Sequence, residues 1–328
     1  MPGGMGLSIL DNLDTLWLMG LDEEYERARS FVHLNLSFNI DAEVNTFETT
    51  IRALAGAPAS ASALHPLPLC LGTRHCTRLP CPPLHPPSHP HPHLHLHLHV
   101  HPHPHPPGLL SAHALTGDDL FLTRALNLGK RLLGAFKTDT QLPAPNINLK
   151  TRKPGYAHWS YNLCTAEMGT LSLEFAQLSD ASGDARFVQA VTRVSEHLAR
   201  AARRAKPHRH LLPIFFQSDG TPSTTDMISL GARGDSYYEY LLKAWLQTGQ
   251  TDAKLRARYD AAIGALSKHL VQRTSNGVTF VAEAYPHGPL RPKMDHLACF
   301  LPGVLALGAT TATSATTTAT ATTATTAT

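Results

Sequence analysis

Apolar residues recur every three or four positions over most of the chain, which is the pattern of amphipathic α-helices. Asp22, Asp118 and Asp184 each come just before such a stripe, where a carboxylate can accept hydrogen bonds from the first free N–H groups of a helix. Residues 5–56 and 108–308 are therefore predicted to be helical.

The helix starts recur at a fixed interval. Gly117, Gly183 and Gly249 are each 66 residues apart. Glycine can end one helix in a left-handed conformation while a following Asp caps the next. A recurring helical hairpin favours stacked helix pairs, as in an α-solenoid or a closed α/α toroid, and chance recurrence of common cap residues is the alternative.

One internal segment breaks the helical pattern. Residues 57–107 hold 12 of the 21 His and 14 of the 25 Pro, and contain no Asp, Glu or Lys. The His residues alternate as in a strand, but the interspersed prolines remove the donors of a strand ladder. The segment is predicted to be a disordered, low-complexity insert, with a metal-binding His tract as the alternative. A structural zinc site is not predicted, because the Cys-x-x-Cys spacing is missing from Cys70, Cys76 and Cys81.

The last residues and the charge limit the function further. Residues 309–328 are Thr and Ala with one Ser, which predicts a tail with no fold of its own or an O-glycosylated stalk. A formal net charge of +3 is too small to favour a nucleic acid as partner. The longest apolar run, residues 297–309, is too short to span a membrane.

Two segments place carboxylates in informative positions. Glu48 and Arg52 are four residues apart on a helix predicted over residues 44–54, so they can form an ion pair on one face. Glu167 is the only charged residue in the first 15 positions of a helical segment predicted over residues 159–175. Such a lone carboxylate is either buried with a partner or lines a cavity.

The densest candidate site begins at Arg233. Asp235 and Glu239 follow at helical spacing on one face, where like charges repel and need a partner or a shifted pKa. Three tyrosines lie among them. Carboxylates can bind sugar hydroxyls while aromatic rings cover the apolar face of a sugar, so this combination suits carbohydrate recognition.

Further candidates lie near the two ends of the chain. Asp14 lies on a largely apolar helix, and Asp295 and His296 come directly before an apolar run. The residues by themselves leave two classes of protein open. One is a glycoside hydrolase that uses paired carboxylates, and the other is an α-solenoid binding module.

Four of these segments together resemble glycoside hydrolase family 47, the class I α-mannosidases, and look most similar to the endoplasmic-reticulum type. The matching motifs are residues 6–17, 44–52, 230–243 and 293–303. The resemblance implies an all-α fold, an (α/α)7 barrel of helical hairpins that is incomplete here. It also implies inverting hydrolysis of terminal α-1,2-linked mannose on high-mannose N-glycans, in the endoplasmic reticulum or Golgi lumen.

The resemblance also implies roles for single residues. Glu48 falls on the proposed general acid, which protonates the leaving oxygen, and Asp235 falls on a second essential acid. Positions that line the sugar pocket in the family fall on Asp14, Arg52, Glu167, Arg233, Glu239 and His296. The family holds a Ca²⁺ ion as well, a hard cation that prefers oxygen ligands.

The chain departs from the family pattern in its organisation. We predict the start of the barrel, an insert, the continuation of the barrel and a tail, over residues 1–56, 57–107, 108–308 and 309–328. Four features of the family find no counterpart in these residues. They are the helices before the first motif, the membrane anchor, the general-base glutamate and the threonine that ligates Ca²⁺.

Single positions depart from the family pattern as well. Cys299 falls on a family disulfide cysteine whose partner has no counterpart here. Gly234 stands where Ala is usual, a change expected to matter little. We therefore expect this chain alone to hydrolyse no α-1,2-mannoside, and a non-hydrolytic, mannosidase-like glycan-binding protein is the alternative.

Overall fold

The computed structural model describes residues 5–55, 108–156 and 162–311, which form helices joined by short connections and small antiparallel sheets. The helices are α1 (Leu7–Leu10), α2 (Leu13–Leu18), α3 (Asp22–Leu34), α4 (Thr46–Thr49), α5 (Leu109–Thr116), α6 (Asp119–Leu132), α7 (Thr165–Gly169), α8 (Ser172–Ser182), α9 (Arg186–Arg204), α10 (Asp235–Gln247) and α11 (Ala253–His269). Residues 301–311 are also helical. Shorter helical turns are η1 (Thr50–Leu54), η3 (Leu133–Phe136) and η4 (His296–Phe300).

The strands are short and lie at the ends of the helices. Three of them form one antiparallel sheet in the order β1 (Glu43–Asn45), β2 (Asn146–Asn148) and β3 (Pro154–Gly155). The others pair in sequence order as β4 (Leu163–Cys164) with β5 (Phe215–Phe216), β6 (Val271–Arg273) with β7 (Thr279–Val281), and β8 (Glu283–Ala284) with β9 (Leu290–Arg291).

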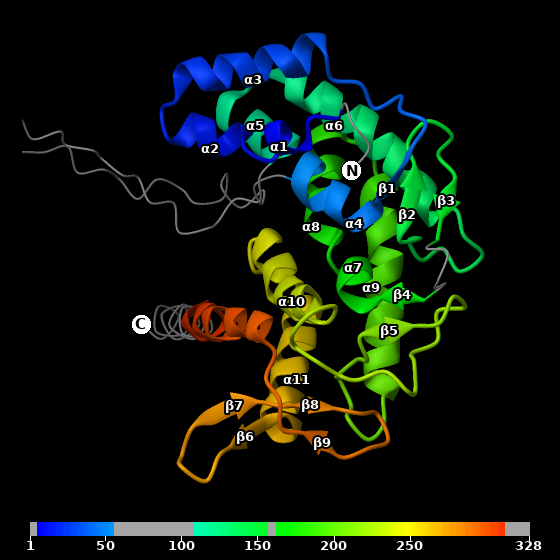
Figure 1. Ribbon diagram of the computed structural model, residues 1–328, viewed down its shortest axis with the longest axis vertical. Coiled ribbons are helices and arrows are strands. Elements are labelled where there is room, and N and C mark those ends of the chain that lie inside the picture. The colour runs from blue at the N-terminus through cyan, green and yellow to red at the C-terminus, as the bar shows by residue number, and fades with distance from the viewer. Residues whose placement is uncertain (1–4, 56–107, 157–161, 312–328) are drawn as a thin grey trace, which may run out of the picture.

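The helices pair as hairpins: α2 with α3, α5 with α6, α8 with α9, and α10 with α11. Neighbouring hairpins pack against each other along an arc, through α2 and α5, α6 and α8, and α8 and α10 (Figure 1). This stacking joins positions 66 residues apart, because the Tyr240 hydroxyl donates to Glu174 at 2.7 Å and Thr170 donates to Ser236 at 2.8 Å. The interval of the predicted repeat is therefore the interval between neighbouring hairpins.

The predicted hairpin repeat is confirmed at its turns. Gly117, Gly183 and Gly249 have φ angles of 70°, 70° and 64°, in the left-handed region that favours glycine. After each glycine an Asp accepts a hydrogen bond from a backbone N–H at the start of the next helix, namely Asp118, Asp184 and Asp252. The predicted cap at Asp22 is wrong, because this residue is the first of α3 and its helix start has no side-chain cap.

Aromatic side chains fill the core between the hairpins. Phe175 of α8 is fully buried, and its ring centroid lies 5.4 Å from that of Phe136 and 6.1 Å from that of Phe187. Gly129 lets α6 approach α8 closely, since a Cβ at this position would overlap Leu178. Burying one such side chain contributes about 1.5–3 kcal/mol, so these contacts largely fix how the hairpins pack.

Two predicted helices are interrupted by strands. The helix expected over residues 44–54 begins only at Thr46, because Val44 pairs with Ile147 in the sheet and the Asn45 side chain then caps α4. The π-helical turn η1 follows it. The segment expected to be helical over residues 159–175 is described from residue 162 and divides into β4, α7 and α8, because β4 pairs with β5.

The insert predicted over residues 57–107 lies outside the described residues, as does most of the predicted tail. Residues 309–311 continue the last helix of the described chain. None of the helices in the described ranges is both long enough and apolar enough to cross a membrane.

Candidate active site

Glu48 of α4 and Arg52 of η1 form the predicted ion pair, with Arg52 Nε 2.6 Å from Glu48 Oε2. The guanidinium also lies 3.5 Å from Asp11, which follows α1, so Arg52 links two carboxylates. The hydrogen bond to Glu48 is the main cause of a raised pKa at Arg52. The Glu48 side chain remains 36% exposed and can therefore meet a ligand from solvent.

Glu167 of α7 is close enough to Glu48 for the charges of the two carboxylates to interact. Burial raises the pKa of Glu167, and the nearby negative charge of Glu48 raises it further. A hydrogen bond from the Asn45 side chain and the positive charge of Arg233 act in the other direction. The lone carboxylate of this segment is thus partly buried and partnered, and it also lines a small cavity, so both alternatives that the sequence left open apply.

Arg233 sits on a tight turn that is bonded to α7. Its φ angle of 73° lies in the left-handed region, and its carbonyl accepts a hydrogen bond from the N–H of Ala166 at 2.9 Å. The guanidinium carbon lies 4.9 Å from the ring centroid of Phe215. The turn therefore carries an exposed cation beside the carboxylate of Glu167.

Asp235 is the first residue of α10, and Glu239 lies one turn along the same face. Burial raises the pKa of Asp235, and the charges of Glu239 and Asp295 raise it further, while the N–H of Ser236 donates to its carboxylate at 2.8 Å. Glu239 forms an ion pair with Lys243 at 2.5 Å. Of the two like charges expected at this spacing, Glu239 therefore has a partner and Asp235 has a raised pKa.

Asp295 and His296 have different positions. Asp295 packs against the turn before α10 so closely that a Cβ on Gly231 would overlap its side chain. The His296 side chain is 87% exposed, with Nδ1 3.6 Å from Asp295 Oδ1. Asp295, rather than His296, is thus the residue of this motif that lies against the α10 turn.

Asp14 of α2 is buried and bonded within the hairpin stack. Ser111 of α5 donates to one carboxylate oxygen at 3.0 Å, and the N–H of Thr15 donates to the other at 2.7 Å. The carboxylates of Glu48 on α4 and of Asp235 and Glu239 on α10 are only partly buried. The structure therefore places Asp14 at the α2–α5 contact rather than among them.

The helices α4, α7 and α10 follow one another in Figure 1, with α7 packed against both α4 and α10. They bring together Glu48, Glu167, Asp235 and Glu239, with the guanidinium groups of Arg52 and Arg233 close by. Asp11 and Asp295 complete this carboxylate cluster; sequence reasoning missed Asp11, and it named Asp295 as a candidate without assigning it to the site. Both lie in motifs that the sequence singles out, but only the tertiary contacts with Arg52 and Gly231 reveal their positions.

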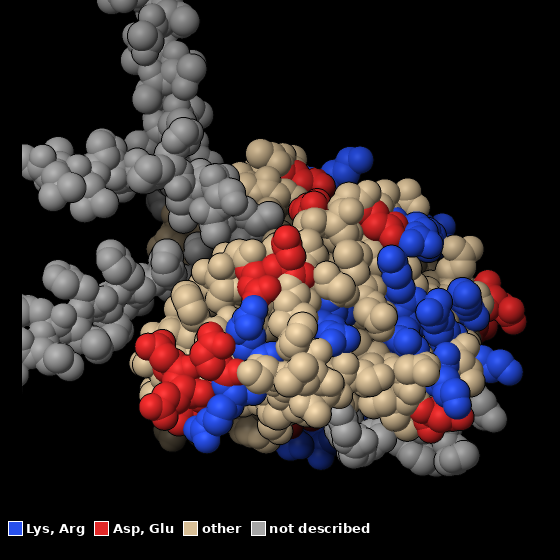
Figure 2. All heavy atoms as spheres, turned by 90° about the horizontal axis from the view of Figure 1, so that it is seen from above, with Lys and Arg blue, Asp and Glu red and all other residues tan. Residues whose placement is uncertain are grey.

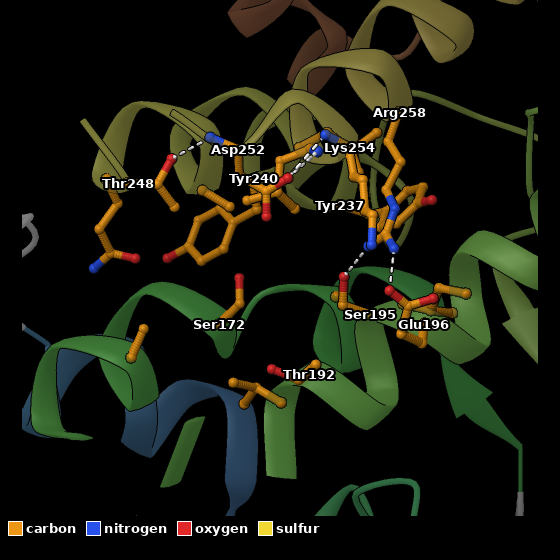
Figure 3. Close-up of a pocket in the computed structure, with 18 of the residues that line it drawn as sticks. Ser172, Thr192, Ser195, Glu196, Tyr237, Tyr240, Thr248, Asp252, Lys254 and Arg258 are labelled. Atoms are coloured by element: carbon orange, nitrogen blue, oxygen red, sulfur yellow. Dashed lines mark hydrogen bonds and ion pairs between the residues drawn. The ribbon is translucent and has the colours of Figure 1, made fainter. Parts of the chain in front are cut away.

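A separate cavity of about 260 Å³ lies between the α8/α9 and α10/α11 hairpins (Figure 3). Tyr237 and Tyr240 line it, and Arg258 donates hydrogen bonds to Ser195 and Glu196 at its edge. None of the eight predicted site residues lines this cavity. The candidate site is therefore the half-exposed carboxylate cluster and not this cavity.

Comparison with known families decides what kind of protein carries this cluster. The model of glycosyl hydrolase family 47 matches residues 1–67 and 107–328. The chain belongs to this family. The matched ranges leave out residues 68–106, which lie within the predicted insert, and they contain all eight candidate site residues.

Curated relatives cover the same part of the chain. The mouse and human proteins named endoplasmic reticulum mannosyl-oligosaccharide 1,2-alpha-mannosidase are each 36% identical over 310 residues, which is 93% of this chain. These residues cover 38% of the mouse protein and 36% of the human protein. The chain thus spans less than two fifths of the length of these relatives.

The structure resembles the alpha-1,2-mannosidase from Trichoderma reesei, with a TM-score of 0.69 and 22% sequence identity over 93% of this chain and 55% of that protein. The predicted fold class, that of an (α/α)7 barrel, is therefore confirmed. The family is calcium-dependent. Among residues 5–55, 108–156 and 162–311, no three His, Cys, Asp or Glu side chains converge as metal ligands would.

Two single positions add to the family comparison. Gly234 has no space for the usual Ala, because a Cβ would overlap the carbonyl oxygen of Ser229. The expectation that this change matters little is wrong for this turn. Cys299 is exposed and, within the described part of the chain, forms no disulfide.

Proposed function

We propose that this chain contributes part of the glycan site of an α-1,2-mannosidase that trims high-mannose N-glycans in the lumen of the endoplasmic reticulum. The observation that carries the proposal is the clustering of Glu48, Glu167 and Asp235 from three helices of a family 47 chain. The names of the mouse and human relatives support both the reaction and the location.

The proposed chemistry divides the carboxylate cluster into two roles. Glu48 acts as the general acid, directly or through a water molecule, and protonates the glycosidic oxygen as the bond to the leaving sugar breaks. Asp235 is the second acid, held at the start of α10 by the N–H of Ser236. An inverting reaction also needs a base and room for the attacking water.

The remaining residues hold the sugar in this proposal. Charged donors and carboxylate acceptors bind hydroxyls strongly, and Arg52, Glu167, Arg233 and Glu239 provide both types at the surface of the carboxylate cluster. The Ca²⁺ of the family, when bound, would supply a cation for sugar hydroxyls and water, and none of the roles proposed for these residues depends on it.

The test measures binding and turnover of α-1,2-mannobiose by the 328-residue chain, using calorimetry and mannose release. We expect binding without release, since no counterpart of the family base is found in these residues. Asp235→Asn should weaken binding at least about tenfold, the size of one charge-assisted hydrogen bond. The matched control Asp180→Asn, an exposed position on α8, should bind like the wild type.

Each other outcome is informative. Mannose release that Glu48→Gln abolishes would overturn the expected inactivity and support the mannosidase assignment. Absence of both binding and release would overturn the assignment of the site. If a longer form that carries the family base binds mannobiose without turnover, the glycan-binding alternative is favoured.

A further inference from the structure

A second cavity, of about 490 Å³, lies beyond the carboxylate cluster and contains none of its residues. It is enclosed by the last two turns of α9, the chain that follows them, the turn at residues 219–224 and the turn that carries His287. Its volume lies in the range of ordinary small-molecule sites.

The charged lining of this cavity has one sign. Arg200, Arg204 and Lys206 contribute three positive charges, and no Asp or Glu lines the cavity. Within the described part of the chain, none of these three cations forms an ion pair. His197, His208 and His287 add further nitrogen groups. Burial lowers the pKa of His208, so its ring stays neutral and adds no charge near pH 7.

Helix α9 itself brings two of the cations together. Arg200 and Arg204 are one turn apart on the helix face that also carries His197, and like charges at this spacing repel each other. A positive charge in the last turn of a helix is stabilised by the negative end of the helix dipole. Arg204 is in the last turn of α9, but Arg200 lies one turn before it and gains less from this effect. A bound anion would remove the repulsion between the two guanidinium groups.

Some cations elsewhere in the described chain have carboxylate partners. On the face seen from above in Figure 2, Lys and Arg side chains have Asp and Glu side chains near them. Lys150 pairs with Asp41 at 3.3 Å, and Arg258 on α11 pairs with Glu196. The cations of the second cavity have no carboxylate of this kind.

The turn opposite α9 is held in place and adds a hydroxyl. His197 Nε2 lies 2.7 Å from the carbonyl of Gly220, and because a carbonyl can only accept, the ring donates. Ser223 is 2% exposed, and its oxygen accepts from the N–H groups of Thr225 and Asp226 at 3.3 and 3.1 Å. Its own O–H can donate to the Thr225 hydroxyl, 3.4 Å away, or toward the cavity.

Leu211, Pro213, Pro222 and Ile228 form an apolar part of the lining, and Thr221 and Thr224 add hydroxyls. We propose that this cavity binds the phosphate group of a small phosphorylated molecule. Guanidinium groups match the oxygens of a phosphate in pairs, three cations suit a dianion better than a single carboxylate, and the apolar part can contact the body of the ligand. The phosphate could belong to a free phosphomonoester or to a lipid headgroup.

The experiment titrates the whole chain with glucose 6-phosphate, glucose and inorganic phosphate by calorimetry at low salt. Vesicles of phosphatidylcholine with and without phosphatidic acid test the lipid source. We expect binding of at least one phosphate compound and none of glucose or of neutral vesicles. Arg204→Ala should weaken that binding at least about tenfold, as expected for a lost charge-assisted hydrogen bond.

Arg203→Ala is the matched control, because it removes the same charge from the neighbouring position of α9. Arg203 directly precedes Arg204 and is also exposed, but it lines a different cavity together with His210. It should leave the affinity within about twofold of the wild type. Equal losses in the two variants would show a general charge effect and overturn the proposal. Absence of phosphate binding by the wild type would overturn it as well.

Discussion

Glu174 of α8 is fully buried at the contact with α10, where the Tyr240 hydroxyl donates to its Oε1 at 2.7 Å. Its Oε2 is also buried and has no hydrogen-bond partner among the described residues. Burial raises the pKa of Glu174 from 4.5 to about 7, although the hydrogen bond from Tyr240 opposes the rise. The folded state therefore prefers the protonated carboxyl, which makes stability depend on pH.

The sign of the dependence follows from the raised pKa. Since the folded-state pKa lies above that of the unfolded chain, the stabilisation is fully present below pH 4.5 and is lost as the pH rises through about 7. A rise from 4.5 to about 7, at about 1.4 kcal/mol for each pKa unit, corresponds to about 3 kcal/mol in the free energy of unfolding. Replacing Glu174 by Gln removes the ionisation and should remove this contribution.

The assay is urea unfolding of the wild type and Glu174→Gln between about pH 5 and about pH 8. Between these limits the wild type should lose about 2–3 kcal/mol more stability than the variant, since part of the full effect falls below pH 5. Glu23→Gln, an exposed position on α3, is the matched control and should follow the wild type. If the curves of the wild type and Glu174→Gln run parallel, the buried carboxyl does not titrate in this range and the reasoning fails.

Three further predictions concern the fold. Gly234→Ala should destabilise the chain by about 1–3 kcal/mol in urea unfolding, because the new Cβ overlaps the Ser229 carbonyl; an unchanged midpoint would mean that the turn relaxes freely. Asp118→Ala should cost about 1–2 kcal/mol, since it removes a helix cap and the 2.7 Å ion pair with Arg29, and thermal unfolding would detect the loss; an unchanged Tm would contradict this. Phe187→Ala should cost about 3–5 kcal/mol by chemical unfolding, and a loss below about 1 kcal/mol would show that the core closes around the cavity.

Local patterns in the sequence predicted much of the fold. The hairpin turns need a left-handed backbone conformation, which glycine adopts readily, and the Asp that follows caps the next helix. The turn of each repeat can therefore be recognised from its Gly and Asp residues. The spacing of Asp235 and Glu239 likewise predicted a shared helix face, because a helix fixes the neighbours of each position. Such features depend on residues only a few positions apart.

The strands and the partners of the site residues were not predictable in this way. Val44 fitted a helical stripe, but its pairing with Ile147 across the chain keeps it in β1. Arg52 meets Asp11 over a sequence separation of 41 residues, a contact that no local pattern encodes. Tertiary contacts override weak local propensities where they satisfy more backbone and charged groups.

The sequence by itself determined the helical hairpins, their interval and the motifs that carry the carboxylates, because turn chemistry and apolar periodicity act over short range. Only the tertiary structure decided the environment of each carboxylate: Asp14 bonded to Ser111, Glu174 sealed against Tyr240, and Glu48 left half-exposed beside Arg52. Burial and long-range partners set the pKa and accessibility of a charged group, and both arise only when the hairpins pack together.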